Sequence, residues 1–195
     1  MSRTAKIWTE AIIALFLCVI AVVTLKIAND GFMKNSYPIE YENHVSRYSD
    51  EYGVDEALVF AVIRTESHFD PEAKSRVDAR GLMQITPETF DWIKSKTKEK
   101  LDDEELFTPK INIKYGAKLL SMLYKEFDST EMVLAAYHAG VGNARKWFED
   151  VAAEDFAISD IAFLETRDYV TKVMDAINIY TKLYFMDNEE DVSNE

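Results

Sequence analysis

Near the start of the chain lies an uncharged apolar run that, together with its flanking residues, is long enough to cross a lipid bilayer. Residues 11–25 carry no charge, and Ile7 and Trp8 extend the apolar stretch on the near side of Glu10. A helix over residues 7–28 would measure about 33 Å at about 1.5 Å per residue, enough for a hydrocarbon core of about 30 Å. We therefore predict a transmembrane helix over residues 7–28.

Two basic residues set the expected orientation of this helix. Arg3 and Lys6 precede the run, so the positive-inside tendency places residues 1–6 in the cytoplasm and the remaining chain outside. The alternative is a cleaved signal peptide. A small-x-small cleavage site is absent after Leu25, where Lys26 follows, and this favours an uncleaved, single-pass anchor in the cell membrane.

The charge and the residue counts exclude several classes of function. Lys and Arg number 22 against 35 Asp and Glu, a formal net charge of −13, so the chain lacks the basic surface on which nucleic-acid binding depends. One Cys and three scattered His provide no zinc-type spacing. The acidic run at residues 102–105 lacks the spacing of a calcium loop. We expect no metal, no cofactor and no nucleic-acid partner.

The remaining chain divides into a tether, one domain and a tail. Residues 29–37 form a short polar tether, and residues 38–186 are the length of a single domain. Residues 187–195 contain five acids and no base, so we expect a solvated, disordered tail.

The pattern of the domain is helical almost throughout. Apolar residues recur at steps of three and four, which draws one apolar stripe along a helix. Two such stripes are Ile113, Ala117, Leu120, Tyr124 and Phe127, and Val170, Val173, Ile177, Tyr180 and Tyr184. No long stretch alternates apolar with polar residues, so no sheet is indicated. The predicted fold class is all-α.

Capping residues and prolines predict where several helices begin. A capping residue followed by proline occurs at Ser36–Pro38, at Thr86-Pro87 and at Thr108-Pro109. Such a pair predicts a helix start, because the missing N–H of proline costs nothing in a first turn. Asp55 is expected to cap a buried helix through residues 57–63 that runs to Glu66. This helix delivers a carboxyl group from the core to its rim. Partial desolvation raises the pKa of such a carboxyl, which suits it to act as a general acid.

Motifs around and after Glu66 resemble those of the soluble lytic transglycosylases, peptidoglycan-cleaving enzymes with a lysozyme-like domain. The family carries Glu-Ser, then Ser-x-x-Gly-Ala-x-Gly-Leu-Met-Gln, then Ala-Tyr-Asn-Ala-Gly, then Glu-Thr-x-x-Tyr-Val-x-x-Val. The corresponding segments here are Glu66-Ser67, Ser75 to Gln84, residues 136–140 and residues 165–173, in the same order. The resemblance covers roughly residues 38–185 and implies a lysozyme-like all-α fold.

The resemblance also implies the reaction and the residues that perform it. Glu66 would protonate the β-1,4 bond between N-acetylmuramic acid and N-acetylglucosamine, and would then deprotonate the muramyl 6-hydroxyl, which closes a 1,6-anhydro ring. The expected partner is the glycan strand of peptidoglycan; no protein partner is indicated. The expected substrate-binding residues are Ser75, Gln84, Tyr137, Glu165, Met83 and Ser67.

Several alternatives stay open at this stage. Glu165 either faces the cleft or complements the dipole at the start of the last helix, and Ser67 is equally suited to a local hydrogen bond at a helix end. For the whole chain, the alternatives are a hydrolytic muramidase and a weakly catalytic glycan-binding scaffold of a wall-spanning machine. The scaffold is disfavoured because four expected site residues are intact, namely Glu66, Ser75, Gln84 and Tyr137.

Three positions depart from the family pattern. Asp78 replaces a glycine, and Asp tolerates the left-handed backbone that such a turn requires. His138 replaces the usual Asn and introduces a group that gains charge at acidic pH. Thr86 stands where many relatives have a Met that lines the sugar site, so the shape of the subsites is expected to differ from the family pattern.

Overall fold

The chain forms two compact units in a computed structural model that describes residues 3–97, 99–149, 151–152 and 154–186. The first unit is Met1–Pro38 and the second is Ile39–Glu195. The acidic tail predicted for residues 187–195 lies outside the described residues.

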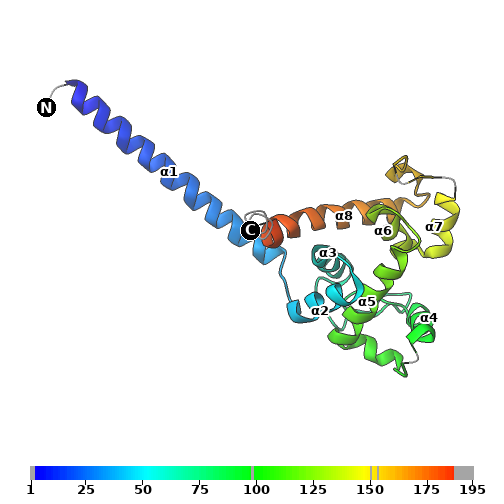
Figure 1. Cartoon of the computed structure of the whole chain (residues 1–195). Coiled ribbons are helices and arrows are strands. Elements are labelled where there is room, and N and C mark those ends of the chain that lie inside the picture. Colours follow the sequence, from blue (N-terminus) through cyan, green and yellow to red (C-terminus); the bar gives the residue numbers. More distant parts are fainter. Residues whose placement is uncertain (1–2, 98, 150, 153, 187–195) are drawn as a thin grey trace, which may run out of the picture. The chain divides into compact units, whose positions relative to one another are not determined.

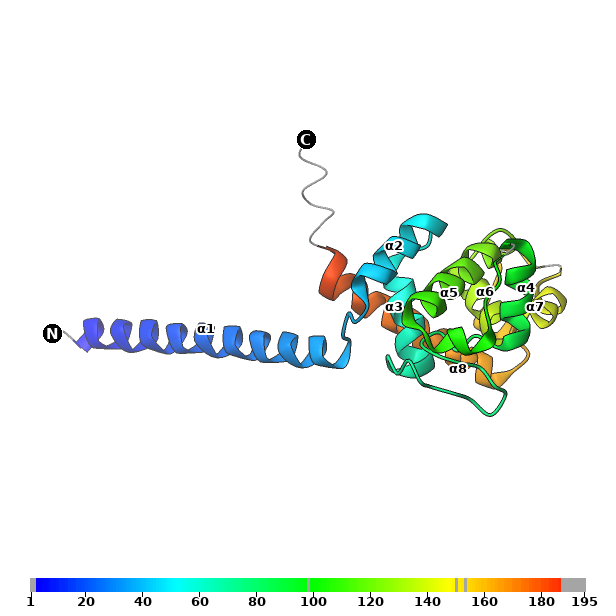
Figure 2. The same ribbon diagram turned by 90° about the horizontal axis from the view of Figure 1, so that it is seen from below.

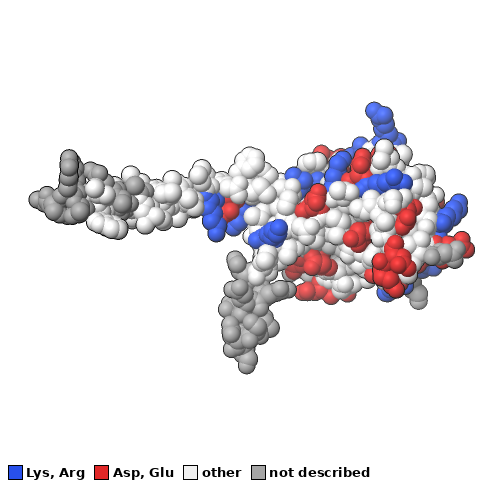
Figure 3. Space-filling model, turned by 90° about the horizontal axis from the view of Figure 1, so that it is seen from above, with Lys and Arg blue, Asp and Glu red and all other residues white. Residues whose placement is uncertain are grey.

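The first unit is a single long helix, α1 (Arg3–Ser36) (Figure 1). Within it, Leu15–Ser36 is apolar and long enough to cross a membrane, and none of this stretch is buried. By length and composition a signal sequence would pass the same test. Figure 3 shows the described part of α1 as mostly uncharged, with charged side chains near its C-terminal end. Residues 29–36, expected to form the tether, continue the helix.

The second unit is helical, and its described residues contain only isolated β-bridges, between Lys74 and Arg80 and between Arg80 and Ile85. The predicted all-α class is therefore confirmed. The helices are α2 (Glu42–Tyr52), α3 (Glu56–Ser67), α4 (Pro87–Thr97), η1 (Asp103–Phe107), α5 (Pro109–Leu123), α6 (Thr130–Ala139), α7 (Val141–Phe148), η2 (Ile158–Asp160), α8 (Leu164–Tyr180) and the π-turn η3 (Thr181–Phe185).

Helix α3 is the centre of this unit, and its seven residues from Ala57 to Ile63 are all buried. It packs against α8 and α2, and the two ribbon views show it between them (Figures 1 and 2). The Asp55 side chain accepts a hydrogen bond from the Leu58 N–H at 3.0 Å, as the capping prediction required. The buried helix that ends near Glu66 is confirmed.

Two of the three helix starts predicted at prolines are confirmed. Pro87 and Pro109 begin α4 and α5, and the Thr86 hydroxyl accepts a hydrogen bond from the Thr89 N–H at 3.2 Å. The start predicted at Ser36–Pro38 is wrong, because α1 runs to Ser36 and α2 begins only at Glu42. Proline disfavours helical backbone in the residue before it, so Pro38 separates two helices instead of opening one.

Candidate active site

A cavity of about 310 Å³ lies where the C-terminal end of α3 meets the loop before α4, helix α6 and the start of α8. Most of its polar lining is uncharged. The lining residues are Glu66, Ser75, Val77, Ala79, Gln84, Ile85, Thr86, Thr89, Leu119, Tyr137, His138 and Glu165. Five of the seven residues expected at a substrate site are therefore brought together here: Glu66, Ser75, Gln84, Tyr137 and Glu165.

Glu66 is the acid whose protonation the protein environment changes most at this site. It occupies the last turn of α3, and burial raises the pKa of its carboxyl from 4.5 to about 7. A contact with the Tyr169 hydroxyl opposes part of this shift. At neutral pH the carboxyl is thus divided between its protonated and ionised forms, and it can give and take a proton.

Two tyrosines stand beside this carboxyl. The Tyr137 hydroxyl donates a hydrogen bond to the Met83 carbonyl at 2.6 Å. The Tyr169 hydroxyl is buried and has no hydrogen bond of ordinary geometry in the described structure. Burial, and then the nearby Glu66 charge, raise the pKa of both hydroxyls well above its usual value, so both stay protonated.

Sequence reasoning missed the role of Tyr169 beside the acid. Tyr169 belongs to the fourth motif, but no role at the site was expected for it from the sequence. Glu165 and Tyr169 are four residues apart, and such residues lie on the same face of a helix. The spacing of four residues therefore indicates that Tyr169 lies near the cavity that Glu165 lines.

The loop between Ser75 and Gln84 folds back on itself through short-range hydrogen bonds. The Ser75 hydroxyl accepts hydrogen bonds from the backbone N–H groups of Val77 at 3.3 Å and Ala79 at 3.1 Å. The Gln84 side-chain amide donates to the carbonyls of Ala73 at 3.0 Å and Gly81 at 2.9 Å. Since both donations use its nitrogen, Gln84 would meet a ligand through its side-chain oxygen.

Asp78 fits the left-handed conformation expected where relatives carry glycine. Its φ is 65°, and its carboxylate pairs with Lys74 at 2.8 Å and with Arg80 at 2.9 Å. The hydrogen bonds from Arg80 and then Lys74 lower the pKa of Asp78 to about 2. The substitution therefore keeps the turn.

A buried amide that the sequence analysis did not single out holds the same loop from behind. Asn112 on α5 accepts a hydrogen bond from the Met83 N–H at 2.7 Å and donates to the carbonyls of Arg80 at 2.8 Å and Leu106 at 2.7 Å. At Gly81, with φ of 70°, an added Cβ would lie 2.2 Å from the Leu106 carbonyl oxygen. The loop is thus pinned to α5 at close range.

The other two expected site residues lie outside the lining of the cavity. The Met83 side chain is fully buried against Gly116, where an added Cβ would lie 2.1 Å from its sulfur. The Ser67 hydroxyl lies 2.8 Å from the Leu82 carbonyl and 3.1 Å from the Ile63 carbonyl. Both residues join the loop to the helices that carry the site.

His138 forms one side of the cavity together with the start of α8. Its Nδ1 lies 3.0 Å from the Thr166 hydroxyl, and its ring stacks on Tyr169 with centroids 4.4 Å apart. Burial lowers the pKa of His138 below 6.5, and the charge of Glu165 opposes this. Glu165 is exposed in the first turn of α8 and also lines the cavity. It therefore meets both alternatives that the sequence left open, since it faces the cavity and lies where an acid complements the helix dipole.

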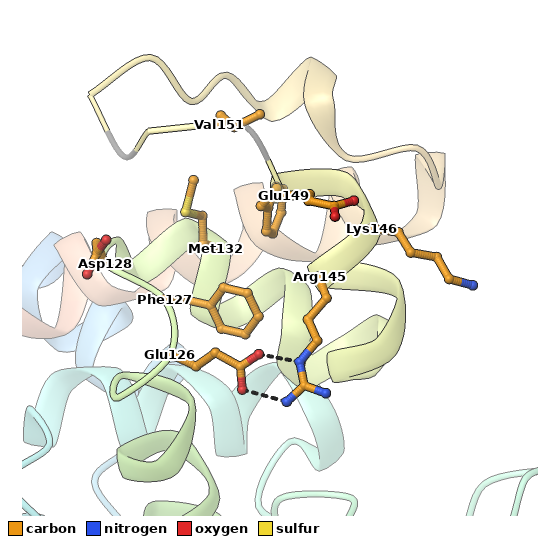
Figure 4. Close-up of a pocket in the computed structure, with 9 residues that line it drawn as sticks. Glu126, Phe127, Asp128, Met132, Arg145, Lys146, Glu149 and Val151 are labelled. Carbon is orange, nitrogen blue, oxygen red and sulfur yellow. Dashed lines mark hydrogen bonds and ion pairs between the residues drawn. The ribbon is translucent and has the colours of Figure 1, made fainter.

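A second cavity, of about 420 Å³, is larger but chemically different (Figure 4). Its lining includes apolar Phe127 and Met132 and the ion pair in which Arg145 donates to both oxygens of Glu126. The hydrogen bond from Arg145 lowers the pKa of Glu126, so this carboxyl stays ionised. The Glu126 carboxyl is therefore less suited than Glu66 to give a proton near neutral pH, and the smaller cavity is the candidate active site.

The comparisons with known proteins agree on one family. The model of the "Transglycosylase SLT domain" family matches residues 43–159. The soluble lytic murein transglycosylase of Salmonella typhimurium is 31% identical over 164 residues, which is 81% of this chain and 25% of that protein. The membrane-bound lytic murein transglycosylase C of Edwardsiella ictaluri is 36% identical over 141 residues, 67% of this chain and 39% of that protein.

Solved structures agree with this result. The 70 kDa soluble lytic transglycosylase from Escherichia coli has a TM-score of 0.73 at 30% identity, covering 78% of this chain and 26% of that one. An inactive mutant of the lytic transglycosylase Slt from Pseudomonas aeruginosa has a TM-score of 0.69 at 34% identity, covering 75% and 24%. The chain spans about a quarter of the length of the soluble relatives it matches.

Proposed function

Because the chain belongs to the Transglycosylase SLT domain family, we propose that it is a peptidoglycan lytic transglycosylase. It cleaves the β-1,4 bond between N-acetylmuramic acid and N-acetylglucosamine and leaves a 1,6-anhydromuramic end. The observation that carries this proposal is the carboxyl of Glu66, placed in a cavity by a buried helix and given a pKa of about 7.

Glu66 serves as both acid and base. When the pKa of a group lies near the working pH, a substantial share of the group is protonated, and the group also loses its proton readily. Glu66 first protonates the leaving glycosidic oxygen. The resulting carboxylate then removes the proton of the muramyl 6-hydroxyl, which attacks the anomeric carbon. That hydroxyl belongs to the same sugar, so its effective concentration exceeds that of a diffusing water.

The cation formed during cleavage needs a negative or polar partner. Glycosidases usually supply a second carboxylate, and Glu165 is the other carboxyl that lines the cavity. In our proposal the 2-acetamido group of the substrate stabilises the cation, and Glu165 binds the sugar. The hydrolytic alternative assigns Glu165 as the base for a water, and the nature of the product distinguishes the two.

The remaining site residues hold the sugar and the loop. Ser75, Gln84 and Tyr137 contact the acetamido group and the reacting ring. Met83 and Ser67 act from behind the cavity, Met83 through the carbonyl that accepts the Tyr137 hydrogen bond and Ser67 through its hydrogen bond to Leu82. The positions of Ser75, Gln84 and Tyr137 in the lining of the cavity support their proposed roles.

We also propose that α1 anchors the enzyme in the cell membrane as a single-pass helix. The N-terminus lies in the cytoplasm, and the catalytic domain, residues 38–186, faces the wall. The uncharged stretch of α1 and the basic residues before it support this arrangement, and one of the relatives is named membrane-bound.

Digestion of purified peptidoglycan tests the proposed reaction. Wild-type protein should yield muropeptides with anhydro ends, which are lighter than hydrolysed ends by one water. Glu66→Gln should reduce turnover roughly 10²- to 10⁴-fold, the usual contribution of general acid-base catalysis. Products with only reducing muramic ends would establish a muramidase. Glycan binding without cleavage by the wild type would establish a scaffold.

A further inference from the structure

The cavity is small for a polymeric substrate. Ligand pockets usually measure about 300–1,000 Å³, and at about 310 Å³ this one is at the lower limit. A glycan strand that has one bond beside Glu66 must therefore continue beyond the cavity over the open surface. This inference rests on the proposed function, because it takes the glycan strand as the substrate.

Helix α4 leads from the cavity onto that surface. Thr86 caps α4 and Thr89 lies in its first turn, and both line the cavity. Trp92 follows Thr89 by three residues, so the two lie on neighbouring positions of one helix face. Phe90 and Ile93 are fully buried and fix the rotation of α4 about its axis.

The general direction of side chains on a helix favours an orientation of Trp92 toward the cavity. Cα–Cβ bonds tilt toward the N-terminus of a helix, and long side chains cover the turn before their own. The Trp92 side chain therefore leans toward the turn that contains Thr89. The Trp92 side chain remains 43% exposed, so part of its ring is available to a ligand.

We propose that Trp92 forms a distal glycan subsite in which its indole ring stacks on a sugar two or more rings away from the cleaved bond. A β-1,4-linked pyranose presents C–H groups on its ring faces, and these pack on an aromatic ring through many small dispersion contacts. A flat contact of this kind accepts both sugars of the strand. The subsite thus binds glycan backbone and selects for strand length.

Binding of glycans to the full-length Glu66→Gln protein in detergent micelles tests this subsite without cleavage. The probes are purified long glycan strands and a tetrasaccharide of N-acetylglucosamine and N-acetylmuramic acid. Trp92→Ala should raise the Kd for long strands by roughly three- to tenfold. The tetrasaccharide should be affected less, and Trp92→Phe should retain most of the affinity because it keeps an aromatic face.

Tryptophan fluorescence provides a second measurement, because the chain has only three Trp residues, Trp8, Trp92 and Trp147. Long strands should change the emission of the Glu66→Gln protein, and Trp92→Phe should remove that change. Tyr124→Ala is the matched control. Tyr124 is 37% exposed and lies near Asp55. Asp55 caps the N-terminal end of α3, whereas Glu66 lies at the C-terminal end, so Tyr124 lies near the end of the helix that is away from the site. Its loss should leave the affinity for strands unaltered.

The outcomes separate this inference from the proposed function. The subsite would be overturned if the Trp92 variants bound long strands with the same affinity as the parent Glu66→Gln protein. If the wild type still cleaved peptidoglycan, the proposed function would remain. Failure of the wild type to cleave, and of Glu66→Gln to bind any glycan, would overturn both. Selective loss of long-strand binding in Trp92→Ala supports the subsite.

Discussion

Glu66→Gln should stabilise the fold at neutral and alkaline pH. The Glu66 carboxyl has a pKa of about 7 in the folded protein, against 4.5 for the unperturbed group, because burial disfavours its charged form. Below about pH 4.5 the carboxyl is protonated in both folded and unfolded states, so it adds no pH-dependent cost. As pH rises toward 7, the unfolded chain releases the proton first, and the folded state loses stability.

The size of this effect follows from the difference between the two pKa values. Each tenfold change in proton affinity corresponds to about 1.4 kcal/mol, so a pKa change from 4.5 to about 7 destabilises the fold by about 3 kcal/mol above pH 7. Gln does not titrate and escapes this cost. In a domain of this size the gain at pH 8 amounts to a rise of roughly 6–12 °C in Tm.

Chemical denaturation of residues 36–195 at pH 4, 6 and 8 measures this difference. Wild type and Glu66→Gln should have similar free energies of unfolding at pH 4, and the variant should be the more stable protein by about 3 kcal/mol at pH 8. Glu72→Gln, in an exposed loop position, is the control for removing one negative charge. A stability difference that does not change with pH would refute the assignment of Glu66 as a desolvated acid.

Three further predictions concern other parts of the molecule. His138→Asn should keep activity and flatten any fall in kcat/KM below about pH 6, because a protonated His138 would favour the ionised form of Glu66; an unchanged pH profile would show that His138 only fills space. Asn112→Ala should lower the free energy of unfolding by at least about 2 kcal/mol, since it leaves the Met83 N–H and the Leu106 carbonyl without their partner at about 1–3 kcal/mol each and removes one of two hydrogen bonds accepted by the Arg80 carbonyl; a loss below 1 kcal/mol in denaturant would contradict this. Full-length protein should remain in the membrane fraction with its C-terminus accessible to protease from outside the cell, whereas a soluble form beginning near residue 25 would remove the anchor.

Local rules were sufficient for the parts of the fold that depend on neighbouring residues. The cap at Asp55, the buried run after it and the position of Glu66 follow from side-chain chemistry within one helix. The left-handed backbone at Asp78 follows from the tolerance of Asp for that conformation. The motifs then identified the loop and helices that supply most of the cavity.

Features set by contacts distant in sequence were outside the reach of these rules. Asn112 is separated by 29 residues from Met83, to which it binds, and nothing near Asn112 in the sequence indicates that contact. Met83 belongs to a substrate-site motif, but packing against Gly116 places its side chain in the core. The boundary between α1 and α2 was misplaced because Pro38 satisfies the rule for a helix start as well as the rule for a helix end.

Burial, and not a neighbouring charge, sets the pKa of Glu66, and this explains how one carboxyl can both give and take a proton. A fixed cation beside Glu66 would hold it ionised, and a close anion would hold it protonated, so either would favour one half of the reaction. The shift at Glu66 arises from burial, opposed only by a neutral tyrosine hydroxyl. Burial disfavours the charged form of Glu66 without placing a fixed ion beside it. The pKa of Glu66 therefore stays near neutral pH, where the carboxyl can act in the acid step and in the base step. A lysine introduced into the lining of the cavity, as in Gln84→Lys, should therefore lower the pKa of Glu66 and impair the acid step first, which an acid shift of the pH profile of kcat/KM would reveal.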